Sequence, residues 1–246
     1  ATDSITCACA TNVLPEGKGV KRDLEHFHIT SKPLQIIGNG NINGIDLEFF
    51  DRTPEVLELA EKYRKEEVVT FCFVGRIVRD KGMNELVAAF QRLHQTYPNT
   101  RLVLVGPFEE KLDPVLPETR QAIEHHAAIE WMGWQNDIRP FLAASEVFVF
   151  PSYREGFPNV VLQAGAMGLP SIVTDINGSS EIITERVNGF IIPSQNEEAL
   201  YKAMEKLLDT EERRKLAQQA RPQIANRYER KALWKELLKF YRSLEG

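Results

Sequence analysis

The chain has 246 residues, 43% of them hydrophobic and 26% charged, with a formal net charge of −5. This composition predicts one or two domains with a buried core and excludes a disordered chain. The acidic balance argues against a nucleic-acid partner, because no broad basic surface is implied. Three cysteines cannot all pair with one another, which favours a reducing cytoplasm. No apolar run approaches the roughly 20 residues that span a bilayer, so any membrane contact would be peripheral, at the inner face.

The first 50 residues differ in pattern from the rest. Ile5–Cys9 is a candidate strand, residues 16–27 are a candidate helix, and Leu34–Ile37 is a second candidate strand. Residues 38–46 follow with three glycines and three asparagines. Such residues favour a tight, hinge-like connection.

From about residue 50 onward, short apolar runs alternate with amphipathic helical stretches. This alternation is typical of parallel βαβ units, and it predicts an α/β fold with a doubly wound, Rossmann-like sheet and ligands at the carboxyl ends of the strands. The predicted strands are 68–74, 101–105, 129–132, 147–150, 171–174 and 190–192, and the predicted helices are 83–93, 118–126, 140–143 capped by Asn136, the stretch that ends at Gly168, 196–208, 210–219 and 222–244.

The segment 153–163 carries the strongest functional signal. It follows the buried run 147–150 and joins a glycine, Gly156, to the start of a helix. Free N–H groups and the helix dipole face an anion at such a place. Pro158 suits the first helical turn, where a missing N–H costs nothing. The N–H groups of the next residues, Asn159, Val160 and Val161, are then expected to remain free for sugar and phosphate oxygens.

Two spacings in the chain carry a family resemblance. Glu155 and the polar residue eight positions on, Gln163, resemble the Glu-x7-Glu signature of retaining glycosyltransferases of the GT-B fold, family 4. The run from Gly75-Arg76 to Lys81-Gly82 is similar to that family's phosphate-binding loop. The resemblance implies three catalytic residues, with Arg76 and Lys81 on the departing diphosphate and Glu155 at the donor sugar. It implies a donor-binding set of Gly75, Gly133, Trp134, Gly156, Phe157, Asn159, Val160, Val161 and Gln163.

Each of these assignments has a plainer alternative. Arg76 and Lys81 could lie in a solvated loop, and Glu155 could only complement the helix dipole. Gln163 stands where the family carries a carboxylate that accepts from both ribose hydroxyls; an amide keeps one such contact, or the side chain has no role. Trp134 could stack on the base or cover the core.

The resemblance also implies a domain organisation. Residues 1–33 correspond to the end of an N-terminal acceptor domain, 34–50 to the interdomain linker, and 51–246 to the donor-binding domain with its C-terminal helices. The acceptor domain itself would lie outside these residues. Binding of the donor with little or no transfer is therefore expected of residues 1–246 alone.

The implied function is transfer of a glycosyl unit from a nucleotide diphosphate sugar, with uridine diphosphate as the first candidate, to a saccharide or lipid-linked acceptor in polysaccharide or capsule biosynthesis. The resemblance implies a metal-independent reaction without a cofactor. The histidines lack the partner spacing of a metal site. The alternatives are a nucleotide-sugar-binding module without catalysis, a GT-B epimerase or hydrolase of nucleotide sugars, and a scaffold with a vestigial pocket.

Overall fold

The computed structural model describes residues 2–109, 111 and 113–245. Six parallel strands form one sheet in the order β3-β2-β1-β4-β5-β6. The strands are β1 (Val69–Val74), β2 (Thr100–Val105), β3 (Ile129–Trp131), β4 (Val147–Phe150), β5 (Ser171–Thr174) and β6 (Gly189–Ile192). The order reverses between β1 and β4, so the carboxyl ends of these two strands form the switch point at which open α/β sheets bind ligands.

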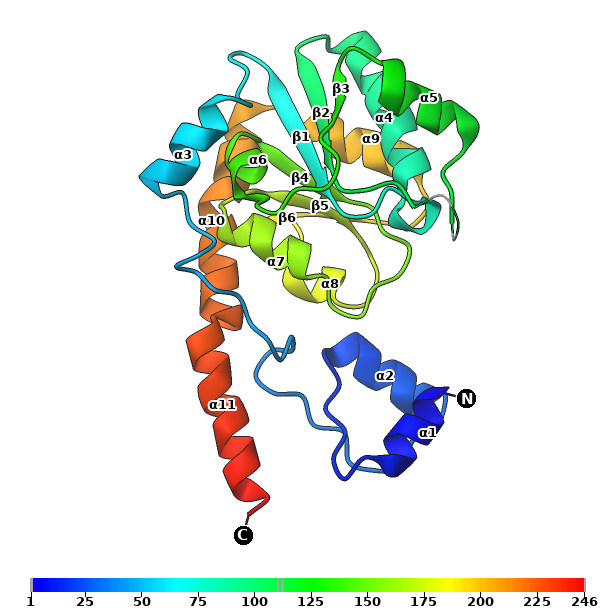
Figure 1. The fold of residues 1–246 in the computed structure, drawn as a ribbon, viewed down its shortest axis with the longest axis vertical. Coiled ribbons are helices and arrows are strands. Elements are labelled where there is room, and N and C mark those ends of the chain that lie inside the picture. The colour runs from blue at the N-terminus through cyan, green and yellow to red at the C-terminus, as the bar shows by residue number, and fades with distance from the viewer. Residues whose placement is uncertain (1, 110, 112, 246) are drawn as a thin grey trace.

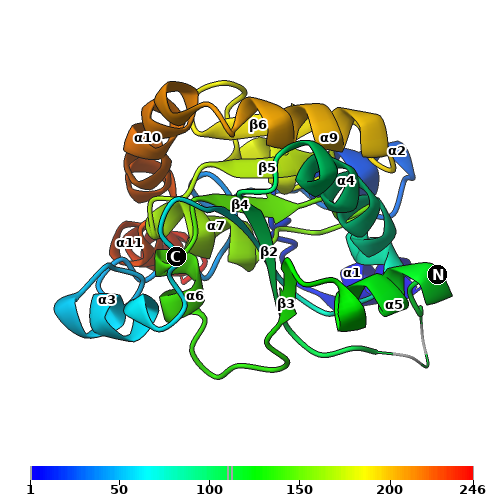
Figure 2. The same ribbon diagram turned by 90° about the horizontal axis from the view of Figure 1, so that it is seen from above.

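Helices cover both faces of this sheet. Figures 1 and 2 show α4, α5 and α9 on one face and α3, α6, α7 and α10 on the other. The helices are α1 (Thr2–Cys9), α2 (Lys18–His26), α3 (Pro54–Glu61), the 3-10 turn η1 (Arg79–Lys81), α4 (Met83–Thr96), α5 (Pro117–His125), α6 (Arg139–Ala143), α7 (Asn159–Ala166), α8 (Ser179–Ile182), α9 (Glu197–Lys206), α10 (Thr210–Tyr228) and α11 (Arg230–Ser243).

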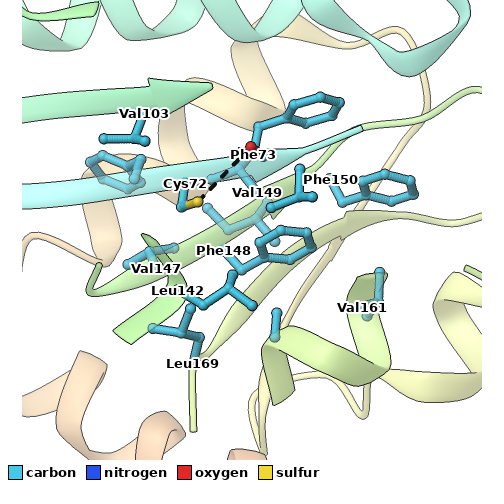
Figure 3. Packing of buried hydrophobic residues seen from close by; sticks show 14 of the residues in the cluster. Cys72, Phe73, Val103, Leu142, Val147, Phe148, Val149, Phe150, Val161 and Leu169 are labelled. Carbon is cyan, nitrogen blue, oxygen red and sulfur yellow. Dashed lines mark hydrogen bonds between the residues drawn. The ribbon is translucent and has the colours of Figure 1, made fainter. Parts of the chain in front are cut away.

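The core lies between the sheet and its two helical layers. β4 contributes four buried residues in succession, as expected of a strand covered on both faces. Figure 3 shows its phenylalanines beside Cys72 and Phe73 of β1, with Val161 of α7 facing them. The prediction of a doubly wound parallel α/β fold is therefore confirmed, and each of the six predicted strands after residue 50 is present.

Two predicted strands near the N-terminus are wrong. Residues 5–9 lie in helix α1, and of residues 34–37 only Leu34 makes an isolated bridge, to Val13. A strand needs a partner for its backbone groups, and this part of the chain packs beside no sheet that could supply one. The predicted helix over 16–27 is present as α2.

Two predictions about helix ends are also wrong. Asn136 does not cap the helix at 140–143: α6 starts after Ile138, and Asp137 accepts the Arg139 N–H at 2.9 Å. The C-terminal break falls at Glu229 rather than near residue 220, because α10 continues through Pro222. Pro222 has no N–H to donate to the Gln218 carbonyl. Both residues are exposed, so water can satisfy that carbonyl.

Residues 2–46 and α11 lie together below the α/β body in Figure 1. Ile37, Leu233 and Phe240 form a small second core there. The linker is joined to the α10–α11 break, since the Ile45 N–H donates to the Tyr228 carbonyl at 2.8 Å and the Arg230 N–H donates to the Ile45 carbonyl at 3.0 Å. The assignment of 1–33, 34–50 and 51–246 to separate domains stays a prediction.

Candidate functional site

An apolar cavity of about 520 Å³ opens at the carboxyl ends of β1, β2 and β3. Its volume is in the range of small-molecule sites. The cavity brings together five predicted site residues from three separate parts of the chain: Gly75, Arg76, Trp134, Val160 and Gln163. The other predicted site residues do not line the cavity. They are Gly133, Lys81, Glu155, Gly156, Phe157, Asn159 and Val161.

The backbones at the ends of β1 and β2 lie very close together beside this cavity. A Cβ atom at Gly106 would be 1.9 Å from the Gly75 carbonyl oxygen, so a side chain at residue 106 cannot be accommodated without movement. The Gly106 N–H donates to the Gly133 carbonyl at 2.8 Å. Gly133 therefore helps to hold the loop after β3 in place and is not itself part of the cavity wall.

Arg76 follows β1 and forms an ion pair with Glu109. The hydrogen bond from this guanidinium to Glu109 raises the pKa of Arg76 above its ordinary value, so the side chain is a permanent cation. The Arg76 side chain is half exposed. An ion pair this accessible is worth little, about 0–1 kcal/mol, so the guanidinium can exchange Glu109 for an anionic ligand.

Lys81 and Glu155 form a second ion pair, at the switch point itself. The two side chains are only 14% and 17% exposed. The Ser152 hydroxyl donates to Glu155 Oε1 at 2.9 Å, and the lysine ammonium lies 5.8 Å from the centre of the Phe150 ring. The turn after β1 and the turn after β4 are thus joined through the two residues predicted to act on the donor.

Further hydrogen bonds fix the same two turns. The Tyr153 N–H donates to the Asp80 carbonyl at 2.8 Å, and the Tyr153 hydroxyl donates to Glu85 at 2.7 Å. Burial and the Glu85 carboxylate raise the pKa of Tyr153, so the phenol keeps its proton. These hydrogen bonds and the ion pair with Lys81 therefore hold the turn that carries Glu155 in place.

The start of α7 differs in detail from the predicted anion site. Pro158 is the N-cap rather than a residue of the first helical turn, and the Val161 N–H is not free, because it donates to the Pro158 carbonyl at 3.1 Å. A 3-10 bond of this kind is common where a helix begins. Phe157 is buried edge-to-face against Tyr228, with ring centroids 5.6 Å apart, so only its backbone can face a ligand.

Two asparagines connect the linker to α7. Asn159 Oδ1 accepts from Asn41 Nδ2 at 2.6 Å, and Asn41 Oδ1 accepts from the Gly44 N–H at 3.1 Å. Asn41 is buried, with a positive φ of 54°. The side chain of Asn159 is therefore oriented from the linker, a contact that the sequence pattern did not reveal.

Trp134 lines the cavity from the loop after β3. Its side chain is 72% exposed, so it does not cover the core, and its ring nitrogen donates to Asn136 Oδ1 at 3.3 Å. Gln163, on α7, reaches the same cavity. An indole ring and a side-chain amide therefore line one cavity; the first can stack on a planar group, and the second can both donate and accept hydrogen bonds.

Sequence reasoning missed the wall that closes the cavity on the linker side. Phe49 and Phe50 line it, and the Arg139 guanidinium lies 3.8 Å from the centre of the Phe49 ring. Arg139 also donates to Asp137, and these hydrogen bonds hold the pKa of Asp137 below its usual value. An aromatic pair directly after a glycine-rich linker was the available signal.

The family model described as "Glycosyl transferases group 1" matches residues 57–223. The capsular polysaccharide biosynthesis glycosyltransferase CapM of Staphylococcus aureus is 29% identical over 247 residues, which cover 97% of this chain and 63% of that protein. The Escherichia coli UDP-Gal:alpha-D-GlcNAc-diphosphoundecaprenol alpha-1,3-galactosyltransferase is 29% identical over 75% of this chain and 48% of its own length.

Solved structures share the fold. HepE of Anabaena in complex with UDP has a TM-score of 0.85 at 19% identity and covers 97% of this chain and 65% of its own. Sucrose-phosphate synthase of Thermosynechococcus elongatus has a TM-score of 0.84 at 23% identity, covering 98% of this chain and 60% of its own. The chain spans about half to just under two thirds of the length of the curated relatives named above.

Proposed function

The chain belongs to the group 1 glycosyl transferases, and from this premise we propose that it binds a nucleotide diphosphate sugar, with a uridine diphosphate sugar as the first candidate. The glycosyl unit is transferred to a saccharide or lipid-linked acceptor. Support for the nucleotide comes from relatives: HepE of Anabaena was solved with UDP, and the E. coli relative is named for UDP-Gal. Support for the acceptor is the naming of relatives for capsular polysaccharide and for a diphosphoundecaprenol-linked sugar.

One observation carries this proposal: the Arg76 cation, the Trp134 ring and the Gln163 amide line a single cavity. A nucleoside diphosphate presents its base, ribose and phosphates in that order. The base would meet Trp134, the ribose would meet Gln163, and the diphosphate would extend past Arg76 toward the Lys81–Glu155 pair. The start of α7 adds its positive end to the same region.

The proposed chemistry is transfer with retained anomeric configuration and without a metal ion. The bond from the anomeric carbon to the diphosphate breaks, and a bond from that carbon to the acceptor oxygen forms on the same face. The acceptor proton passes to an oxygen of the departing diphosphate. The protein's task is then to stabilise negative charge on the leaving group, which the cations Arg76 and Lys81 can do in a preorganised site.

Calorimetric titration with UDP and UMP tests the binding mode. Arg76→Ala should weaken UDP binding by about tenfold or more, since a charge-assisted hydrogen bond is worth about 1.5–3 kcal/mol, and should change UMP binding much less. Arg79→Ala is the matched control, because Arg79 is paired with Asp113 and lies outside the cavity. Equal losses for UDP and UMP would contradict the placement of the diphosphate at Arg76.

Transfer itself is tested with the full-length protein and a panel of nucleotide sugars. Glu155→Ala should remove transfer while the protein still binds UDP; full transfer activity of this variant would show that Glu155 is not needed for the reaction. Nuclear magnetic resonance of the product reports the anomeric configuration, and assays with a chelator report metal dependence. Residues 1–246 alone should bind the donor with little transfer, and efficient transfer by them would overturn the need for an acceptor domain.

A further inference from the structure

Arg139 joins two segments of the cavity lining without lining the cavity itself. One segment is the end of the linker, with Phe49 and Phe50, and the other is the loop of residues 134–138 after β3. Arg139 follows that loop directly, as the first residue of α6. Two segments that are far apart in sequence therefore meet at one side chain outside the cavity.

The guanidinium of Arg139 holds Phe49 both by its backbone and by its ring. Arg139 Nη1 donates to the Phe49 carbonyl at 3.1 Å, and the guanidinium lies 3.8 Å from the centre of the Phe49 ring. The quadrupole of an aromatic ring attracts a cation placed over its face. The Phe50 ring packs edge-to-face on Phe49, with centroids 5.0 Å apart. Arg139 therefore fixes the Phe49 ring directly and the Phe50 ring through it.

The same guanidinium holds the loop after β3. Arg139 Nε donates to Asp137 Oδ1 at 2.9 Å, and Arg139 Nη2 donates to Asp137 Oδ2 at 2.7 Å. Such a bidentate pair fixes the orientation of the two groups as well as their distance. All five residues from Trp134 to Ile138 line the cavity, and none of them belongs to a helix or a strand. Side-chain contacts such as this pair therefore hold the shape of the loop.

Partial burial strengthens the contacts of Arg139. Its side chain is 20% exposed, and that of Asp137 is 35% exposed. Salt screens a partly buried ion pair less than a fully exposed one. The hydrogen bonds to Asp137 also raise the pKa of Arg139 above its ordinary value. The link between Phe49 and the loop therefore stays charged at physiological pH.

We propose that Arg139 is a positioning residue for the nucleobase, an inference that rests on the proposed function, in which the base meets Trp134. Arg139 keeps the Phe49–Phe50 pair and the 134–138 loop in a fixed arrangement, so the base enters a cavity that is already formed. A site formed in advance binds more tightly because little further ordering is needed when the ligand enters. Arg139 does not touch the ligand, and its effect passes through Phe49 and Asp137.

Calorimetric titration with UDP, UMP and uridine tests this role. Arg139→Ala should weaken the binding of all three ligands by a similar factor of about fivefold, because the contacts that it removes hold the part of the cavity proposed for the base. Arg76→Ala, in contrast, should weaken UDP binding much more than UMP binding. A loss confined to UDP would place the effect of Arg139 at the diphosphate and would overturn the inference.

Arg92→Ala is the matched control. Arg92 also pairs with a carboxylate, that of Glu198, and its guanidinium also lies over an aromatic ring, 4.1 Å from the centre of Tyr201. These contacts join α4 to α9 and do not involve the cavity. Arg92→Ala should therefore leave the affinities for UDP and uridine unchanged. Equal losses in the two variants would show a general effect of removing a surface arginine and would refute a specific role for Arg139.

Two further changes test the route through Phe49 and serve if Arg139→Ala folds poorly. Arg139→Lys keeps a cation near Phe49 but cannot form the bidentate pair, so it should recover part of the lost affinity. In a Phe49→Leu protein, which lacks the ring, the added change Arg139→Ala should reduce uridine affinity by clearly less than it does when Phe49 is present. Fully additive losses would show that Arg139 does not act through Phe49, contrary to the inference.

Failure of this inference and failure of the proposed function give different results. A folded Arg139→Ala protein that binds UDP and uridine with native affinity would overturn the positioning role alone. If the unaltered chain binds neither uridine nor UDP, the proposed function is wrong, and the positioning role is wrong with it.

Discussion

Replacement of Gly82 by alanine is a direct test of how the two turns of the site are joined. Gly82 follows η1 and has a φ of +71°, and an added Cβ would lie 2.1 Å from the Pro151 carbonyl oxygen. Pro151 opens the turn that carries Glu155, and Gly82 directly follows Lys81. A larger residue at 82 must therefore push apart the two segments that hold the Lys81–Glu155 ion pair.

The expected cost has two parts. The left-handed backbone conformation destabilises a folded protein with alanine at this position by about 1–2 kcal/mol. Alanine also lowers the conformational entropy of the unfolded chain, which offsets about 0.4–1 kcal/mol of that loss. Forcing a methyl group into a packed region adds about 1–3 kcal/mol. Gly82→Ala should therefore lower the free energy of unfolding by about 1–5 kcal/mol, with a central value of about 3 kcal/mol. It should also weaken UDP binding, because Lys81 moves.

Gly168→Ala is the matched control for this experiment. Gly168 has a φ of +81°, but an added Cβ would have no neighbour within 4 Å, so only the backbone cost applies. Urea unfolding should show a loss of about 1 kcal/mol or less, and calorimetry should show unchanged UDP affinity. Equal losses of stability in the two variants would refute the argument that the Pro151 contact joins the turns.

Three further predictions follow from the site and the core. Gln163→Glu should strengthen UDP binding several-fold in calorimetry, with a smaller gain for 2′-deoxyuridine diphosphate, because a carboxylate accepts from both ribose hydroxyls; an equal gain for both ligands would argue against a ribose contact. Burial and the nearby His94 lower the pKa of His126, so His126 takes up a proton on unfolding at mildly acidic pH. The free energy of unfolding should therefore fall as the pH drops below about 6.5, the ordinary pKa of histidine. Urea unfolding should show a flatter pH dependence for His126→Gln. Burial raises the pKa of Cys72 to about 12, so iodoacetamide at mildly alkaline pH should label the exposed Cys9 and spare Cys72, as mass spectrometry can check.

The strands and the main elements of the site were predictable because their signals are local. An apolar run such as 147–150 followed by glycine and a helix start specifies a strand, a turn and a helix without reference to distant residues. Parallel strands then bring their carboxyl ends to one edge, which places Arg76 near Gln163. The strand predicted over residues 5–9 is absent for the complementary reason, because an apolar run forms a strand only where a partner strand exists.

Other features of the site depend on contacts between residues far apart in sequence. Glu109 and the linker residues Phe49 and Asn41 have no spacing that connects them to the site. Pro222 is another case, since a proline predicts a helix end only when the carbonyl four residues earlier, here that of Gln218, cannot reach water. Periodicity describes the face that an element buries; it does not identify the side chain that approaches from another element.

The two ion pairs show why this distinction matters for function. The sequence predicts two cations near the proposed donor site, but it cannot show that each cation already has an anionic partner. The half-exposed Arg76–Glu109 pair can open at little cost. Breaking the enclosed Lys81–Glu155 pair would leave a carboxylate uncompensated, at a cost of about 3–5 kcal/mol. Arg76 is therefore the cation free to change partners when a diphosphate enters, whereas Lys81 is expected to keep Glu155 in place throughout.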